Sequence, residues 1–228
     1  NLAERFVLIG DHQQLPPVVR AENDLQESLF ERLIEAHPEA GVMLDRQYRM
    51  AQQIQAFPSK AFYDGQLRPA TGDVAAQRID DLAGVSLPAL PEHLRERVAF
   101  VDPGGSARGN TNPAEADAVT ETVEQFAAAG VSREDIGVIA PFRAQVAEIG
   151  QRLDDSVAVD TVDRFQGSSK EVILVSFVAT GELEGPIFED NRRINVALTR
   201  AKKSLVLVGD AAALSSDETY AEMVAWAR

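Results

Sequence analysis

The stretch VILVSFVATGELEGPIFEDNRRINVALTRAKKSLVLV, residues 172–208, decides the fold class of this chain. It begins with an apolar run at Val172–Val178 and ends with another at Leu205–Val208, and a more polar segment that favours a helix, Arg192–Ala201, lies between them. Strands that are apolar on both faces belong inside a parallel sheet, because crossover helices cover both faces of such a sheet. We therefore expect an α/β fold, mainly a parallel sheet with helices on both faces.

The same alternation extends towards the N-terminus and to the end of the chain. We predict further strands at Val98–Val101, Ile136–Ala140 and Val157–Asp160, and helices at Pro113–Ala129, Arg143–Leu153 and Glu218–Trp226. Upstream we predict a buried strand Phe6–Ile9, a helix Leu25–Ala36, a strand Val42–Leu44, and a helix Gln52–Ala61 with a break near Pro58. Residues 69–96 have little periodicity, so we expect a loop or a small insertion there.

Composition narrows the class of protein. The chain has 228 residues, is 45% hydrophobic and contains no cysteine, which excludes disulfides, thiolate metal sites and a thiol nucleophile. Its three histidines are irregularly spaced, so we expect no metal site. The segment NLAERFVLIG does not have the pattern of a leader peptide, and no run approaches 18 apolar residues. We therefore expect a cytoplasmic protein without a membrane segment, nucleoid-associated or nuclear according to its source.

The charge balance is strongly acidic, with 36 acidic residues against 22 basic ones and a net charge of −14. Such a balance opposes nucleic-acid binding by bulk attraction. A surface rich in carboxylates and poor in lysine suits concentrated salt, so we hypothesise a halophile as the source, testable by unfolding in low and molar KCl. Five basic residues are nevertheless concentrated near the C-terminus: Arg192, Arg193, Arg200, Lys202 and Lys203.

Five segments resemble, in order, motifs III, IV, IVa, V and VI of superfamily 1 helicases. They are VLIGDHQQLPPVV (7–19), LDRQYRM (44–50), VIAPFRAQV (138–146), VDTVDRFQGSSKEVILVSFV (159–178) and RRINVALTRAKKSLVLVG (192–209). The motif sequences are most similar to those of the superfamily 1 group that translocates 5′ to 3′. Within that group they most resemble the replication helicase/nuclease family of Okazaki-fragment processing. The resemblance implies a RecA-like P-loop NTPase fold and, for this chain, the second motor domain.

The resemblance also implies which residues meet ATP. Arg200 matches the arginine finger of motif VI, Arg49 a second phosphate-contacting arginine, and Gln14 the glutamine that senses the γ-phosphate. Arginine suits this role because its rigid fork of donors neutralises charge spread over several oxygens. Tyr48 matches the ring that stacks on adenine. The plain alternatives are surface salt bridges for the arginines and an exposed loop position for Gln14.

Motif V departs from the family pattern. Gln166 and Gly167 match it, but Ser169 stands where an acidic residue near the nucleotide sugar is expected, and Glu171 lies two residues further on. A serine hydroxyl can still hydrogen-bond a ribose, although more weakly than a carboxylate. The expected effect is looser sugar recognition with hydrolysis retained.

A second set of residues is expected to contact single-stranded DNA. Backbone N–H groups, hydroxyls and amides hold phosphates without a basic surface, which reconciles DNA binding with the acidic charge. The matching residues are Pro141, Phe142, Arg143 and Gln145 of motif IVa, Thr161 of motif V, and Arg192 and Arg193. Phe142 either stacks on a base or belongs to the core.

The phosphate cradle itself is missing. No segment reads G-x-x-x-x-G-K-[ST], and no predicted strand ends in the Asp-Glu pair that holds Mg²⁺. In the family both belong to the first motor domain, so we expect residues 1–20 to end that domain and residues 21–228 to form the second. ATP and Mg²⁺ would then be held mainly by the first RecA-like domain of the same protein, and the chain alone would be inactive. The resemblance to a helicase/nuclease also implies a nuclease domain upstream as a partner.

Three other functions stay open. An RNA helicase of the nonsense-decay type shares QYRM and ALTRA, although GDHQQLPP and ILVSFV favour DNA. A module that binds nucleic acid without ATPase activity is disfavoured because Gln14, Arg49 and Arg200 are all present. An acidic α/β domain with unrelated chemistry is the least favoured of the three, because it does not explain five ordered motifs.

Overall fold

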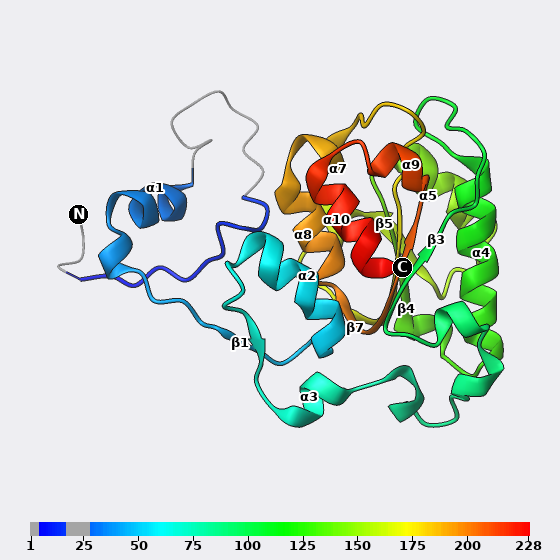
Figure 1. The fold of residues 1–228 in the computed structure, drawn as a ribbon, viewed down its shortest axis with the longest axis horizontal. Helices are drawn as coiled ribbons and strands as arrows, with labels where there is room; N and C mark the ends of the chain where they lie inside the picture. The colour runs from blue at the N-terminus through cyan, green and yellow to red at the C-terminus, as the bar shows by residue number, and fades with distance from the viewer. Residues whose placement is uncertain (1–4, 17–27) are drawn as a thin grey trace.

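The computed structural model describes residues 5–16 and 28–228 and centres on one five-stranded sheet (Figure 1). The order is β3-β7-β6-β4-β5, and every neighbouring pair is parallel. The strands are β3 Val98–Val101, β4 Ile136–Ala140, β5 Ala158–Thr161, β6 Lys170–Ser176 and β7 Ala201–Val208. The predicted α/β class is therefore confirmed.

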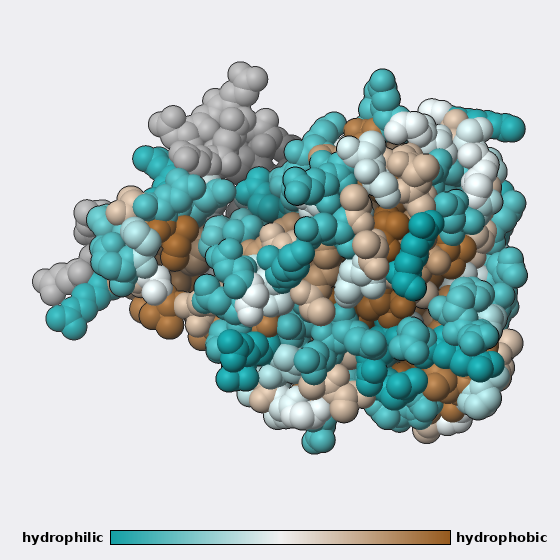
Figure 2. All heavy atoms as spheres, in the orientation of Figure 1, coloured by the Kyte–Doolittle hydropathy of each residue, from teal (hydrophilic) through white to brown (hydrophobic). Residues whose placement is uncertain are grey.

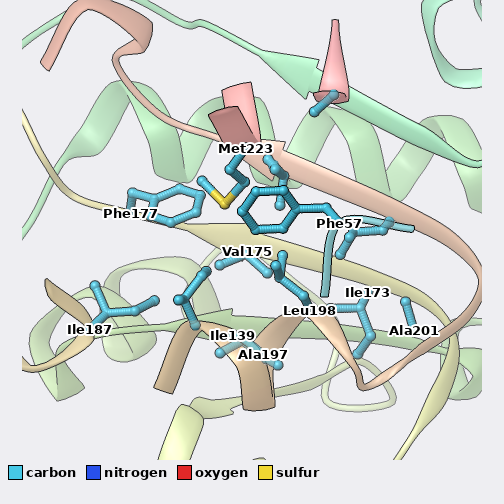
Figure 3. Packing of buried hydrophobic residues seen from close by; sticks show 14 of the residues in the cluster. Phe57, Ile139, Ile173, Val175, Phe177, Ile187, Ala197, Leu198, Ala201 and Met223 are labelled. Atoms are coloured by element: carbon cyan, nitrogen blue, oxygen red, sulfur yellow. The ribbon is translucent and has the colours of Figure 1, made fainter. Parts of the chain in front are cut away.

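Helices cover both faces of this sheet, as Figure 1 shows. Helices α4 (Pro113–Ala128) and α5 (Arg143–Gly150) lie on one face, and α2 (Gln52–Phe62), α8 (Asn191–Leu198) and α10 (Glu218–Ala227) on the other. Alternate residues of β6 supply the two cores. Val172 and Leu174 pack under α4 and α5, whereas Ile173 and Val175 pack with α2, α8 and α10, the side shown in Figure 3.

Three short helices occupy turns that the sequence pattern did not predict. They are α6 Val162–Phe165, α7 Pro186–Glu189 and α9 Ala211–Leu214. One helical turn carries too few residues to show a period of 3.6. Each of these helices still buries apolar side chains. In α6, for example, Val162 and Phe165 are buried.

The predicted break in α2 and the predicted end of α8 are wrong. Helix α2 continues through Pro58 without a break, because Gln55 and Ser59 both donate hydrogen bonds to the Leu67 carbonyl and anchor the helix on either side of the proline. Helix α8 ends at Leu198, and β7 begins already at Ala201. Apolar residues occur both in ALTRA (197–201) and in the strand that follows, so the sequence pattern does not show where the helix ends and the strand begins.

The stretch predicted as a loop or insertion contributes to the core. Strand β2 (Arg68–Pro69) pairs in parallel with β1 (Arg46–Gln47), and α3 (Gly72–Ala76) follows. Three 3-10 turns come next, at Ile79–Asp81, Leu87–Ala89 and Glu92–Leu94. Ile79, Leu90 and Leu94, which lie in or directly after these turns, are buried in the cluster beneath α4. Isolated apolar residues in irregular backbone gave no periodic signal.

The segments before β1 form an N-terminal arm, which we define as residues 5–16 and 28–45 (Figure 1). Its helix α1 (Leu29–Ala36) buries none of its residues; the predicted start at Leu25 lies outside the described residues. Phe6–Ile9 and Val42–Leu44, predicted as strands, belong to no strand within the described ranges. Their side chains are exposed and contribute to the hydrophobic surface beside α1 in Figure 2.

Where the structure is described, no helix combines the length and the hydropathy needed to cross a membrane.

Candidate functional site

Two arginines converge on Thr199, between α8 and β7. Arg49 donates to the Thr199 carbonyl at 2.9 Å, and Arg200 donates to the Thr199 hydroxyl at 3.0 Å. Neither arginine forms a salt bridge with a carboxylate of the described residues. Burial, and then the charge of Arg49, lower the pKa of Arg200 to about 10, and burial lowers the pKa of Arg49. Two partly desolvated cations that form no salt bridge with a described carboxylate make a site that favours an anionic ligand.

Gln47 holds Arg49 in place. Its side-chain oxygen accepts hydrogen bonds from the backbone N–H groups of Arg49 and Met50, each at 2.7 Å, and its amide donates to the Met50 carbonyl at 2.8 Å. This closed turn leaves the neighbouring Tyr48 ring 76% exposed. Gln47 belongs to the QYRM motif, but the motif alone predicted no role for it.

The loop Asp11–Leu15 lies against the arginines. Gln14 accepts a hydrogen bond from Arg200 at 3.4 Å, so the structure brings these two predicted residues together. Gln166 donates to the Leu15 carbonyl at 3.1 Å, and Asn195 donates to the Gln13 carbonyl at 2.7 Å. The loop is thus attached to the turn before β6 and to α8.

These groups border a cavity of about 480 Å³. Its lining residues are Asp11, Gln14, Gln47, Tyr48, Arg49, Met50, Tyr63, Leu67, Ser169, Thr199 and Lys202. Arg200, only 2% exposed, lies behind this lining and touches it through Gln14 and Thr199. Gly167, with φ of 87°, shapes the turn that presents Ser169. Two arginines, an exposed ring and a hydroxyl beside one cavity fit the phosphates, base and ribose of a nucleotide.

The cavity lies at an unexpected edge of the sheet. Ligands of open parallel sheets gather at the carboxyl ends of the strands, and the motifs were expected there. Ser169 and Arg200 instead directly precede β6 and β7, and the Ala51 N–H donates to the Lys202 carbonyl at the start of β7. The residues predicted to meet ATP therefore sit at the amino ends of these strands.

The residues predicted to contact single-stranded DNA lie at the opposite, carboxyl edge. Thr161 at the end of β5 is paired with Ala140 at the end of β4, so it lies beside the turn Pro141–Arg143. Pro141 is buried, Phe142 is half-buried and Arg143 is exposed. The structure brings these predicted residues together at one edge.

Gln145 requires a correction, because it is 0% exposed. Its side chain accepts from the Asn112 N–H at 2.9 Å and donates to the Asn112 carbonyl and the Ser176 hydroxyl, both at 3.1 Å. A side chain so enclosed and satisfied has no group to offer a nucleic acid. The structure gives it the role of tying α5 to α4 and β6.

Arg192 and Arg193 of the basic cluster near the C-terminus are paired with carboxylates. Arg192 pairs with Asp190 at 2.8 Å and with Glu31 at 3.4 Å, and Arg193 lies 3.6 Å from Asp163. These carboxylates compete with phosphates for both arginines.

Lys202 and Lys203 are likewise neutralised, since each donates to Glu171 at 2.7 Å. Burial alone would raise the pKa of Glu171, but the two lysines lower it below its ordinary value. Glu171 is therefore engaged with lysines and does not replace the acid missing at Ser169.

Across the described residues, no group of three or more histidine, aspartate or glutamate side chains is arranged to hold a metal ion.

Comparison with known proteins places the chain among helicases. Residues 25–212 match the family model of an AAA domain. The chain is 36% identical to an uncharacterised ATP-dependent helicase of Methanocaldococcus jannaschii, over 98% of this chain and 35% of that protein. It is 38% identical to a DNA replication ATP-dependent helicase/nuclease of Arabidopsis thaliana, over 93% of the chain and 17% of that protein.

The human DNA replication ATP-dependent helicase/nuclease is 37% identical over 91% of the chain and 22% of its own length. The chain thus spans about a third or less of these relatives. Among solved structures, the C-terminal domain of a possible DNA helicase from Lactobacillus plantarum aligns with a TM-score of 0.43 and 16% identity, over 72% of this chain and 88% of that one.

Proposed function

Because the chain belongs to the AAA-domain family of superfamily 1 helicases, we propose that it is the second motor domain of an ATP-dependent 5′ to 3′ DNA helicase. In this proposal Arg200 is the arginine finger, and Arg49 and Gln14 contact the terminal phosphate. Tyr48 stacks on the base and Ser169 hydrogen-bonds the ribose. The phosphate cradle and the Mg²⁺ ligands belong to the first motor domain of the same protein.

The observation that carries this proposal is the arginine pair. Two neighbouring guanidinium groups repel each other, and burial removes the water that would stabilise them. Arg49 and Arg200 nevertheless share Thr199 and form no salt bridge with a described carboxylate. The anionic phosphates of ATP, bound in the adjoining cavity, would supply the missing negative charge. Placed there, arginines stabilise the charge that spreads over the phosphoryl oxygens during transfer.

The loop Asp11–Leu15 provides a route from nucleotide state to domain movement. Gln14 contacts Arg200 directly, and Gln166 and Asn195 bind the backbone on either side of Gln14. A phosphate that binds Arg200 competes with Gln14 for the same guanidinium. Rearrangement of this loop on ATP binding would therefore alter how the arm that carries it lies against the sheet.

We propose that single-stranded DNA lies at the carboxyl ends of β4 and β5. Pro141–Arg143 and Thr161 would contact it, mainly through backbone N–H groups and a hydroxyl at phosphates. Gln145 stabilises this surface from the interior through its hydrogen bonds to Asn112 and Ser176. Arg192 and Arg193 would lie at the margin of the surface. Two relatives are named helicase/nuclease, so a nuclease domain in the same protein, in a nucleoid or nuclear location, completes the proposal.

The N-terminal arm is proposed to belong to the first motor domain. Phe6–Ile9 and Val42–Leu44 are apolar on successive residues and exposed, a pattern typical of parallel strands buried on both faces. They would complete the sheet of that domain, and the boundary between the motor domains would then lie near Gln47 rather than near residue 20.

Arg200→Ala in the full-length protein tests the function. DNA-stimulated ATP hydrolysis should fall by about three orders of magnitude or more, while single-strand affinity stays near the wild-type value. Arg152→Ala is the control, because it removes an arginine that is paired with Asp117 and Glu148 and belongs to neither candidate site, and it should keep most of the turnover. Normal hydrolysis by Arg200→Ala would contradict the assignment, and stronger stimulation by RNA than by DNA would favour the RNA helicase instead.

A further inference from the structure

A buried carboxylate lies outside both candidate sites. Glu115, in the first turn of α4, is 0% exposed. The groups that donate to it, from Asn112 on its own helix cap and from Ser176 and Val178 at the end of β6, are all uncharged. Burying a carboxylate without a cation is costly. Its position therefore points to a specific task for its acceptor oxygens.

Glu115 holds the chain where it leaves the sheet. Its Oε2 accepts hydrogen bonds from the Ser176 hydroxyl at 2.6 Å and from the Val178 N–H at 2.9 Å. Val178 has φ of 60°, a left-handed conformation in which a β-branched side chain collides with its own backbone. Such a conformation persists only where the surrounding structure holds it, and the bond from Glu115 does so.

The turn at Val178 directs the next residues, 179–185, to the edge where β4 and β5 end (Figure 1). The Thr180 hydroxyl accepts a hydrogen bond from the Ala107 N–H at 2.8 Å. The loop then passes so near Phe142 that a Cβ on Gly185 would lie 2.3 Å from the ring. The loop therefore forms one side of the space that holds the Phe142 ring.

We propose that Glu115 is a positioning residue for single-strand binding. By holding Val178 in its left-handed conformation, it fixes the loop 179–185 and, through Gly185, the ring of Phe142. This inference rests on the proposed function, because Phe142 belongs to the proposed DNA-contacting surface. None of the residues that line the nucleotide cavity bonds to Glu115, so its effect is confined to strand binding.

Two substitutions at position 115 in the full-length protein distinguish the effect of the hydrogen bonds to Glu115 from the effect of its packing. Glu115→Met keeps an unbranched side chain but removes both acceptors, whereas Glu115→Gln keeps one oxygen that can accept from Val178. Affinity for a fluorescent oligothymidine, measured by anisotropy, should fall about tenfold in Glu115→Met and stay near wild type in Glu115→Gln. Affinity for a fluorescent ATP analogue should be unchanged in both variants.

Val178→Gly supplies the deciding control. Glycine adopts positive φ without strain, so Glu115→Met/Val178→Gly should recover most of the strand affinity lost by Glu115→Met. A loss that glycine does not restore, or that extends to the ATP analogue, assigns Glu115 to general packing and overturns the proposal. Wild-type affinity in Glu115→Met overturns it as well. If the wild-type protein itself does not bind the oligonucleotide, the proposed function fails first.

Discussion

The Tyr63 hydroxyl donates a 2.7 Å hydrogen bond to the Asp11 carboxylate, and these residues are 52 positions apart in the chain. The same hydroxyl accepts from the Asn195 amide at 2.9 Å, and that amide also donates to the Gln13 carbonyl at 2.7 Å. Tyr63 thereby joins the end of α2, the loop Asp11–Leu15 and α8. Burial, and then the charge of Asp11, raise the pKa of Tyr63 to about 12, so the hydroxyl stays a donor at any working pH.

We expect Tyr63→Phe to lower ATP turnover in the full-length protein. Without the hydroxyl, Asp11 loses its bond to α2, and the loop that carries Gln14 is held less firmly beside Arg200. A hydrogen bond to a charged group contributes roughly 1.5–3 kcal/mol, so kcat should fall about tenfold or more. Steady-state ATPase kinetics with saturating single-stranded DNA measure the change.

Tyr220→Phe is the matched control for this variant. Tyr220 donates to the Ile187 carbonyl at 2.6 Å and lines no part of the cavity beside Arg49. Its loss should reduce thermal stability and leave kcat near the wild-type value. An equal fall of kcat in both variants would show that turnover follows stability and not the position of the loop.

Glu115 should impose a pH dependence on folding stability. Burial raises its pKa from the ordinary value of 4.5 to about 7. Between these pH values the folded protein keeps a proton that the unfolded chain has lost. The stability from this group is therefore fully present below pH 4.5 and is lost as the pH rises through 7.

Glu115→Gln cannot titrate, so the difference in unfolding free energy between wild type and variant isolates this group. Across the window, wild type should lose about 3 kcal/mol relative to Glu115→Gln. Urea unfolding at several pH values, followed by circular dichroism, measures it. Parallel pH profiles for the two proteins would mean that Glu115 keeps an ordinary pKa.

The fold was predictable where strands are buried on both faces. Ile136–Ala140 and Val98–Val101 were predicted with their observed bounds, because a short continuous apolar run between helical segments is typical of a buried strand. Phe6–Ile9 was also predicted as a strand, but it pairs with no described strand. An apolar run can predict that a segment favours a buried strand, but it does not reveal whether a partner strand is present.

The site was predictable residue by residue only where a motif marked a side chain. Gln14 and Arg200 do meet, but Gln145 and Gln14 look alike in sequence, and only packing shows that Gln145 is buried. Tyr63 and Asn195 lie in FYDGQL (62–67) and RRIN (192–195), where no role was predicted for either. Hydrogen bonds between distant segments leave no local pattern that could have marked them.

Single-strand binding should depend weakly on salt. Arg192, Arg193, Lys202 and Lys203 of the basic cluster are paired with Asp190, Asp163 and Glu171, and Arg200 is buried. Few free charges therefore remain to displace counter-ions from DNA. Each phosphate neutralised contributes a slope of about −0.7 in log K against log salt for single strands. We expect a total slope shallower than about −2 from titrations in increasing KCl. A markedly steeper slope would show that phosphates displace these carboxylates.

The proposal that the N-terminal arm belongs to the first motor domain can be tested with one double substitution. The substitution is made both in this chain by itself and in the full-length protein. Val7 is 86% exposed and Ile9 is 89% exposed, so Val7→Asp/Ile9→Asp should change the stability of this chain by itself by no more than about 0.5 kcal/mol. In the full-length protein the same aspartates would be buried in the sheet of the first motor domain. Burying unpaired carboxylates there should cost several kcal/mol, which lowers the melting temperature by roughly 5 °C or more. Val7→Thr keeps the β-branched shape without a charge and should have a much smaller effect. Equal melting temperatures for the full-length wild type and the double aspartate variant would show that these side chains stay in solvent, and the arm would then not belong to the first motor domain.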